Sequence, residues 1–345
     1  MQNELKIKSI LTPQKVISVT LMMCAVLAAV IVLSLVLGTA DVSLKDIIGV
    51  ITGAVSEDDP VRLIIFKIRL PRIILAGLVG FALSLGGVTF QAILRNPLAD
   101  PFILGVSSGS AFGAVLAITF GLSFTFGVPV MSFAGGLFTV YLVMSLGARK
   151  MGMESSTILL TGVIVNAFFT AIIMFFISTS ADDRLHTMLF WLYGDLSQSQ
   201  YSQLMIIGPF IIIAGIILYS FSRDLNIITT GDEMASQLGV DVNLTKKVGL
   251  LTISLLMGLV VAFSGLIGFV GLIVPHLARM AFRADHRMLI PVASIGGAIF
   301  LIAADTLART LVSPSELPVG VITAFLGAPF FLILLRKRGS HWSRS

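Results

Sequence analysis

The chain has 345 residues, of which 56% are hydrophobic and only 12% are charged, and its mean hydropathy is +1.01. A soluble domain carries about 25% charged residues, so this chain has too few polar side chains to cover itself in water. The composition predicts an integral membrane protein with many spans. The net charge of +5 is spread over loops and chain ends, so it gives no sign of a nucleic-acid partner.

Apolar runs recur along the whole chain. A helix needs about 20 apolar residues to cross a bilayer. The run 248–282 is ambiguous because it is long enough for two short spans and has glycines near its middle. The other candidate runs are 16–38, 72–94, 101–121, 126–147, 156–178, 203–222, 288–305 and 318–335. The total is therefore nine or ten spans.

Basic residues decide between these two totals. Lysines precede the first run, and Arg336, Lys337 and Arg338 follow the last. Cytoplasmic segments are enriched in Lys and Arg, so both termini are expected in the cytoplasm, which requires an even number of spans. We predict an all-α polytopic membrane protein with ten transmembrane helices. It forms a single transmembrane domain, 1–345, with cytoplasmic tails 1–15 and 336–345 and a cytoplasmic loop 223–247.

Three arginines fall on the outer side in this topology. Arg69 and Arg72 are three residues apart at the start of the second span, and Arg309 follows the ninth. Residues at this spacing share a helix face, and guanidinium groups bind carboxylates in bidentate fashion. The arginines are expected to be exposed. They either receive carboxylates of another protein or anchor the chain among lipid headgroups. Asp305 precedes Arg309 by four residues, which favours an ion pair between them over proton transfer.

Small and polar residues interrupt two of the central runs. Gly105, Gly109 and Gly113 recur every four positions, a spacing that lets helices approach closely. The fifth span carries the polar side chains Thr161, Asn166 and Thr170 among apolar residues. These side chains either line a path through the membrane or form hydrogen bonds between helices.

The cytoplasmic segment between spans six and seven predicts a short helix. Thr230 and Glu233 have the spacing of a capping box, and Gly239 is suited to end the helix. Met234 and Leu238, four residues apart, would form one apolar edge. This edge is suited to a groove on another protein, although an ordinary capped loop helix would show the same pattern.

Several function classes lack their sequence signals. No GxxxxGK[ST] stretch is present, so the chain does not hydrolyse ATP through a P-loop. Ion-gradient-driven transporters carry carboxylates within their spans, and this chain has almost none at span centres. An intramembrane metalloenzyme would need a motif such as HExxH, and the four histidines are dispersed. We expect neither a catalytic site nor a bound metal.

Three long blocks resemble one known family. They are "RLPRIILAGLVGFALSLGGVTFQAILRNPLADPFILGVSSGSAFGA", "GFVGLIVPHLAR" and "DTLARTLVSPSELPVGVITAFLGAPFF". In these blocks the chain resembles the iron–siderophore and vitamin B12 permeases of ABC importers, the FecCD type. The resemblance runs from about residue 60 to the C-terminus. It implies ten transmembrane helices per subunit, in agreement with the charge argument.

The resemblance also implies partners. Two permease subunits, alike or different, would pair around the translocation path in the plasma membrane of a bacterium. Two cytoplasmic ABC ATPase subunits would use ATP and Mg²⁺, and an extracytoplasmic binding protein would deliver the cargo. A ferric siderophore is the expected cargo, with haem or cobalamin as alternatives. This chain itself would bind no cofactor.

Site residues follow from the same resemblance. Arg69, Arg72 and Arg309 would receive acidic residues of the binding protein. Thr161, Asn166 and Thr170 would lie on the helix that lines the path, with Ser155 and Ser156 at the cytoplasmic gate. The ATPase would hold a coupling helix made by Asp232, Glu233, Met234, Ala235, Leu238 and Gly239.

Overall fold

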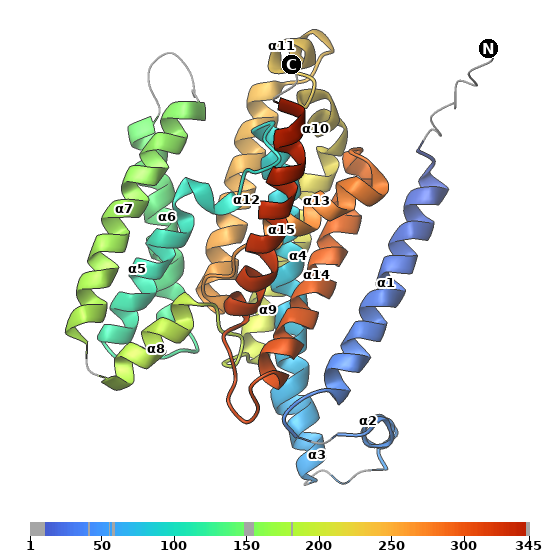
Figure 1. Cartoon of the computed structure of the whole chain (residues 1–345), viewed down its shortest axis with the longest axis vertical. Helices are drawn as coiled ribbons and strands as arrows, with labels where there is room; N and C mark the ends of the chain where they lie inside the picture. Colours follow the sequence, from blue (N-terminus) through green and yellow to red (C-terminus); the bar gives the residue numbers. More distant parts are fainter. Residues whose placement is uncertain are drawn as a thin grey trace.

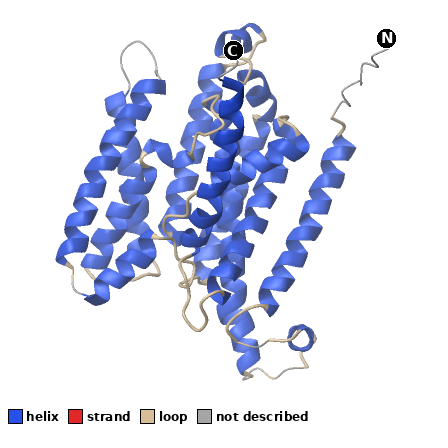
Figure 2. Ribbon diagram, in the orientation of Figure 1, coloured by secondary structure: helices blue, strands red, loops and turns tan. Residues whose placement is uncertain are grey.

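The computed structural model describes residues 11–40, 42–54, 56, 59–147, 155–180 and 182–342. Throughout these ranges the regular secondary structure is helical, without strands (Figure 2). The helices form an elongated bundle whose long members run roughly along one direction (Figure 1). This architecture agrees with the all-α prediction.

Ten apolar helices account for the predicted spans. In the described residues, six are long and apolar enough to cross a membrane, and four more are apolar but shorter. Their bounds are α1 Pro13–Val36, α4 Leu70–Ile93, α5 Val106–Thr119, α6 Gly127–Gly147, α7 Ser155–Thr179, α9 Tyr201–Ser220, α12 Val242–Ser264, α13 Val270–Phe282, α14 His286–Thr310 and α15 Val319–Trp342. Each predicted run thus coincides with a helix, although how many of them cross a bilayer stays a prediction.

The ambiguous run 248–282 is split into α12 and α13, as its glycines indicated. The chain breaks at Gly265, which has a φ of +67°. A Cβ atom at this position would lie 2.1 Å from the carbonyl oxygen of Trp191, so only glycine fits. The break therefore depends on both the backbone conformation and the close approach of another segment.

Shorter helices connect the long ones. They are α2 Leu44–Ile51, α3 Pro60–Leu63, the π-helix η1 Ile64–Arg69, the 3₁₀ helix η2 Pro101–Leu104, α8 Asp182–Leu192, α10 Ser222–Ile228 and α11 Asp232–Gln237. The α3 and η1 turns continue directly into α4, giving one helical stretch Pro60–Ile93. The predicted run 101–121 starts at Pro101, but η2 comes first and α5 begins at Val106.

The centre of the bundle is the pair α4 and α14. Gly80 and Gly297 face each other there, and a Cβ atom on Gly80 would lie 2.2 Å from the carbonyl oxygen of Gly297. Small residues permit such close backbone contact between membrane helices. The predicted glycine packing of α5 is confirmed in the same way. A Cβ atom on Gly109 would meet Gly135 and Thr139 of α6.

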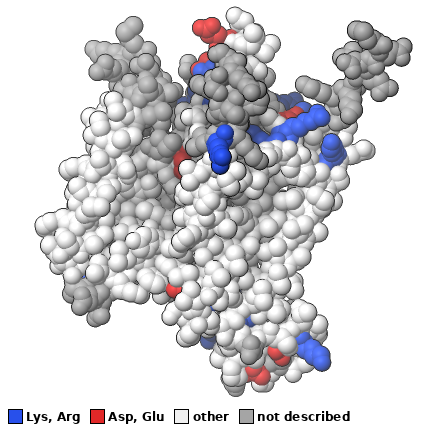
Figure 3. All heavy atoms as spheres, in the orientation of Figure 1, with Lys and Arg blue, Asp and Glu red and all other residues white. Residues whose placement is uncertain are grey.

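The bundle has two distinct ends. The helix α11 lies at one end, together with the start of α1 and the end of α15, whereas α2 and α3 lie at the other (Figure 1). We name these the α11 end and the α2 end. Charged side chains on the face in Figure 3 gather toward the two ends and leave a broad uncharged belt between them. Such a belt is suited to the hydrocarbon core of a bilayer.

Candidate functional site

The three predicted arginines meet at the α2 end. Arg69 closes η1, Arg72 lies in the first turn of α4, and Arg309 lies in the last turn of α14. All three are buried, with exposed fractions of 4%, 5% and 4%. The prediction that they are exposed was therefore wrong, because other parts of this chain already surround their guanidinium groups.

Arg69 is held by backbone oxygens of the first helix. Its Nη1 donates to the carbonyl oxygens of Leu35 and Val36, and its Nη2 donates to that of Ala40. The last carbonyls of a helix have no partner within the helix. Arg69 therefore caps the C-terminal end of α1, and it fixes that end against the start of α4.

Arg72 lies between two carboxylates that differ in exposure. Its Nε lies 3.0 Å from Asp305 Oδ1, and its Nη2 also lies 3.0 Å from that oxygen. On the other side, Nη1 lies 2.6 Å from Glu316 Oε2. The side chain of Asp305 is 1% exposed, whereas that of Glu316 is 37% exposed. One partner is thus inside the protein and the other borders the solvent.

Arg309 shares the buried carboxylate. Its Nε lies 3.1 Å from Asp305 Oδ2, which confirms the predicted i, i+4 ion pair. Its Nη2 donates to Ser34 Oγ at 2.9 Å, and the Ser34 hydroxyl also lies 2.7 Å from Thr306 Oγ1. These bonds connect α1 to α14. Asp305 therefore neutralises two guanidinium groups that come from different helices.

A small cavity of about 100 Å³ opens beside this cluster. Three guanidinium groups and one carboxylate line it, together with apolar and backbone atoms. The lining residues are Thr39, Ala40, Ile64, Ile68, Arg69, Arg72, Arg309 and Glu316. We call Arg69, Arg72, Arg309, Asp305 and Glu316 the arginine cluster. It combines three guanidinium groups with two carboxylates.

The short helix predicted between spans six and seven is present at the α11 end as Asp232–Gln237, and its coupling role stays a prediction. Met234 and Leu238 are 51% and 62% exposed, so an apolar edge faces outward, whereas Ala235 is buried. Gly239 has a φ of +84°, as a helix-ending glycine requires. The predicted capping box is wrong. The hydroxyl of Thr230 donates to the carbonyl oxygen of Ile227 in the preceding helix, α10.

The chain between α10 and α11 turns at Gly231, whose φ of +128° and ψ of +147° are open to glycine alone. The helix then begins at Asp232, which pairs with two cations. Its Oδ2 lies 2.6 Å from Lys246 Nζ at the start of α12, and its Oδ1 lies 3.8 Å from Arg95 at the end of α4. These pairs, which the sequence analysis missed, fix α11 to two long helices.

A second polar contact joins α10 to α14. Asn226 Nδ2 donates to Asp285 Oδ1 at 2.9 Å, and the backbone N–H of His286 donates to Asn226 Oδ1 at 2.8 Å. The hydrogen bond from Arg287 lowers the pKa of the Asp285 carboxyl to about 2, although partial burial opposes this shift. Asp285 is therefore ionised and caps the first turn of α14.

The predicted path residues lie on α7. Asn166 is exposed, and Thr161 and Thr170 are half-buried. Around them α7 presents a row of exposed apolar side chains, including Leu160, Val163, Ile164, Phe168, Met174 and Phe175. The side chains of Ser155 and Ser156 lie outside the part of the chain that the structure describes. A role of any of these residues in transport stays a prediction.

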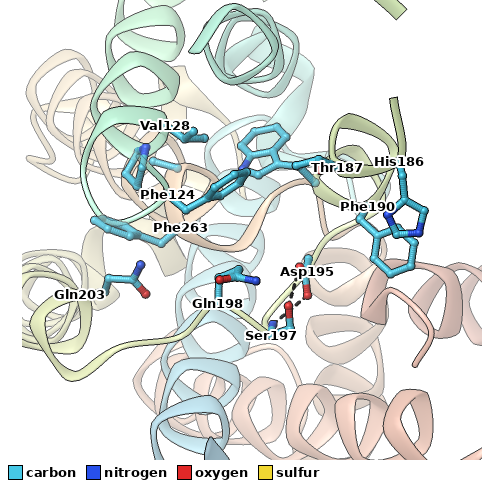
Figure 4. Close-up of a pocket in the computed structure, with 13 residues that line it drawn as sticks. Phe124, Val128, His186, Thr187, Phe190, Asp195, Ser197, Gln198, Gln203 and Phe263 are labelled. Atoms are coloured by element: carbon cyan, nitrogen blue, oxygen red, sulfur yellow. Dashed lines mark hydrogen bonds between the residues drawn. The ribbon is translucent and has the colours of Figure 1, made fainter. Parts of the chain in front are cut away.

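A larger cavity of about 370 Å³ lies beneath α8. Figure 4 shows its aromatic walls, which include Phe124, Phe190 and Phe263, facing the polar side chains of Gln198 and Gln203. Asp195 also borders the cavity, but its carboxylate accepts from the backbone and hydroxyl of Ser197. No sequence pattern indicated these residues, because they come from separate helices and loops that meet only in the folded chain.

Apolar helices, a buried ionic cluster at one end and an exposed short helix at the other define a polytopic integral membrane protein. Among the described residues, no group of three His, Cys, Asp or Glu side chains is placed to hold a metal ion. A family model described as the FecCD transport family matches residues 26–337. The chain belongs to the FecCD transport family.

Comparisons with individual proteins agree with this family. The chain is 42% identical to the cobalamin import system permease protein BtuC of Halobacterium salinarum, over 80% of this chain and 74% of that protein. It is also 42% identical to the hemin transport system permease protein HmuU of Yersinia pestis, over 82% and 86%. A solved metal-chelate type ABC transporter in an inward-facing conformation matches with a TM-score of 0.82. It is 34% identical, and the match covers 93% of this chain and 99% of that one.

Proposed function

We propose that this chain is the permease subunit of an ABC importer in the inner membrane of a bacterium. The match of the FecCD family model to residues 26–337 carries this proposal. The likeness to a solved metal-chelate type ABC transporter supports it, because that likeness covers 93% of the chain. In this proposal all ten apolar helices span the membrane, and both termini lie in the cytoplasm.

The α11 end would receive the ATPase subunits. The exposed apolar edge of Met234 and Leu238 supports this role, because such an edge is suited to a hydrophobic groove on the ATPase. Asp232 holds this edge in place through Lys246 and Arg95. Since the sequence has no P-loop, the partner ATPases would bind ATP and Mg²⁺, and this chain would be no enzyme.

The α2 end would receive an extracytoplasmic binding protein. The three guanidinium groups that line the small cavity support a partner with carboxylates at its docking surface. Arg72 and Arg309 border the small cavity, and Arg69 reaches it while capping α1. Because all three are buried, a visiting carboxylate must enter the cavity.

The exposed apolar face of α7 would face a second permease subunit, identical or related. Its row of large apolar side chains supports this role. Thr161, Asn166 and Thr170 would line the path between the subunits, and Ser155 and Ser156 would lie at its cytoplasmic gate. A weakly polar lining without charge is suited to a bulky cargo that must not bind tightly.

The cargo that we propose is a ferric siderophore. Haem or cobalamin is the second candidate, because relatives 42% identical to this chain are named for hemin and for cobalamin. An ion-gradient-driven mechanism is the distant alternative. Against it stands Asp305, the buried carboxylate of α14, which is already neutralised by two arginines.

Uptake measurements test the proposal. Cells with the gene should accumulate ⁵⁵Fe supplied as ferric siderophores, and cells without it should not. The variant Met234→Asp/Leu238→Asp should reach the membrane but lose most of the uptake, because charges on the exposed edge would prevent ATPase binding. Leu244→Asp is the matched control, since Leu244 is also exposed near α11 but lies on α12.

Each cargo gives a different outcome. Uptake of ⁵⁷Co-cobalamin or of haem, and of no ferric siderophore, would replace the proposed cargo with the second candidate. Uptake that continues after ATP depletion but stops with an ionophore would contradict the ABC mechanism. Normal uptake by Met234→Asp/Leu238→Asp would contradict the coupling role of α11.

A further inference from the structure

The two carboxylates that bind Arg72 have different settings. Asp305 lies within α14, is 1% exposed and also contacts Arg309. Glu316 lies in the segment 311–318 after α14, which is outside any helix. It forms a 2.6 Å ion pair with Arg72, and its side chain is 37% exposed. Asp305 is thus a fixed partner of Arg72. Glu316 borders the solvent, so its side chain can move away from Arg72 without leaving an empty space inside the protein.

We propose that Glu316 is an exchangeable internal carboxylate, which occupies the solvent side of Arg72 until a carboxylate of the docking protein replaces it. The proposal rests on the docking role of the arginine cluster and deepens it. It makes Glu316 a residue that sets docking affinity, although Glu316 has the same charge as the incoming partner.

The geometry of Arg72 indicates where an incoming carboxylate can bind. A guanidinium group has five N–H donors in a fixed plane. Nε and Nη2 of Arg72 point to Asp305, and Nη1 points to Glu316. An incoming carboxylate therefore reaches Arg72 from the solvent side only where Glu316 now lies. Docking must break the contact between Arg72 and Glu316.

The charge balance around Arg72 indicates that Glu316 is replaced by another carboxylate. With Glu316 in place, the cluster holds three guanidinium groups and two carboxylates. If Glu316 left alone, the buried guanidinium groups of Arg72 and Arg309 would share the single carboxylate of Asp305, which is unfavourable. A carboxylate that replaces Glu316 keeps the balance, and the cavity of about 100 Å³ between Arg69, Arg72 and Arg309 lies directly beside this position.

A purely structural role for Glu316 predicts the opposite effect. If Glu316 only held the segment 311–318 against α4, its removal would loosen the docking surface and weaken binding. If it competes with the partner, its removal strengthens binding. The sign of the change in affinity therefore separates the two roles.

The test uses the full chain in lipid nanodiscs and a fluorescent octaglutamate peptide as the probe, with an octaglutamine peptide as the control. Glu316→Gln should bind octaglutamate about two- to fivefold more tightly by fluorescence anisotropy, the fold-change that corresponds to one exposed ion pair. Glu316→Asp should restore the weaker binding. Ser315→Ala, an exposed neighbour outside the cluster, should bind like the unaltered chain. The gain should diminish as salt is raised, because exposed charge pairs are screened.

Two other results would overturn the proposal in distinguishable ways. Unchanged or weaker binding by Glu316→Gln would overturn the role of Glu316. If Arg72→Gln, which leaves Asp305 paired with Arg309, abolished peptide binding in that case while it kept the thermal unfolding of the unaltered chain, the docking role of the cluster would stand. If neither the unaltered chain nor Glu316→Gln bound octaglutamate, the docking role would fall together with the exchange.

Discussion

At the scale of single residues, Asp305 is the centre of the arginine cluster. It is 1% exposed and contacts the guanidinium groups of Arg72 and Arg309. A buried charge is tolerable only when it is paired and hydrogen-bonded. Ser34 and Thr306 supply further polar partners to Arg309. The cluster is therefore a set of mutually dependent charges, and the removal of one leaves others unpaired.

Replacement of Asp305 by Asn should be strongly destabilising. It leaves two buried guanidinium groups without their shared carboxylate, and the loss of one partner of a buried pair costs about 3–5 kcal/mol. Thermal unfolding of the chain in detergent micelles measures the effect. Glu316→Gln is the matched control. Its loss should be smaller, because Glu316 borders the solvent and Arg72 keeps Asp305 as a partner. Equal losses in the two variants would show that Asp305 is not buried as described.

Single residues also show what spacing along the chain can predict. The pair Asp305 and Arg309 followed from their separation by four residues in one helix. The pair Arg72 and Asp305 did not, because the two are 233 residues apart and meet only when α4 packs on α14. Likewise, the burial of Arg69 depends on where α1 ends in space, and the sequence around Arg69 carries no signal of it.

At the scale of helices, close glycine contacts hold the centre of the bundle together. Lipid tails are as apolar as leucine side chains, so packing and not burial from water brings membrane helices together. Gly80 of α4 and Gly297 of α14 permit backbone contact, and both helices are buried along most of their length. A larger side chain at either glycine would push the two helices apart.

Gly80→Leu should therefore destabilise the fold, by more than the about 1–3 kcal/mol that overpacking usually costs, because the obstacle is backbone. Gly215→Ala in α9 is the control. A Cβ atom there comes no closer than 3.9 Å to a neighbouring side chain, and alanine is the better helix former by about 1 kcal/mol. Denaturation followed by circular dichroism compares the two. Equal stability of both variants would contradict the close contact between α4 and α14.

Helix prediction succeeded where hydrophobicity alone decides and failed where local conformation does. All ten apolar helices were located, including the split at Gly265. The helix α8 was missed because Asp182–Leu192 is short and contains charged residues. The predicted capping box at Thr230 was wrong. Gly231 has a backbone conformation that turns the chain between Thr230 and α11, so the Thr230 side chain does not cap α11. The glycine at position 231 permits that conformation but does not by itself predict it, because glycine adopts many others.

At the scale of the whole molecule, α4 and α14 connect the two proposed interaction sites. The helix α4 begins at Leu70, has Arg72 in its first turn and ends near Arg95, which pairs with Asp232 of α11. The helix α14 begins beside Asp285, which contacts Asn226 of α10, and ends at Arg309. A partner that changes the arginine cluster therefore acts on the same two packed helices that hold the α11 end.

This arrangement has a functional meaning only if the two ends face opposite sides of the membrane. Accessibility of single cysteines to a membrane-impermeant maleimide tests the orientation, after Cys24→Ala removes the native thiol. Ser315→Cys at the α2 end should react in intact cells, because position 315 is exposed beside Glu316. Gln237→Cys, exposed on α11, should react only after the membrane is permeabilised. The reverse pattern would place the arginine cluster in the cytoplasm, where no extracytoplasmic protein reaches it, and would contradict the importer.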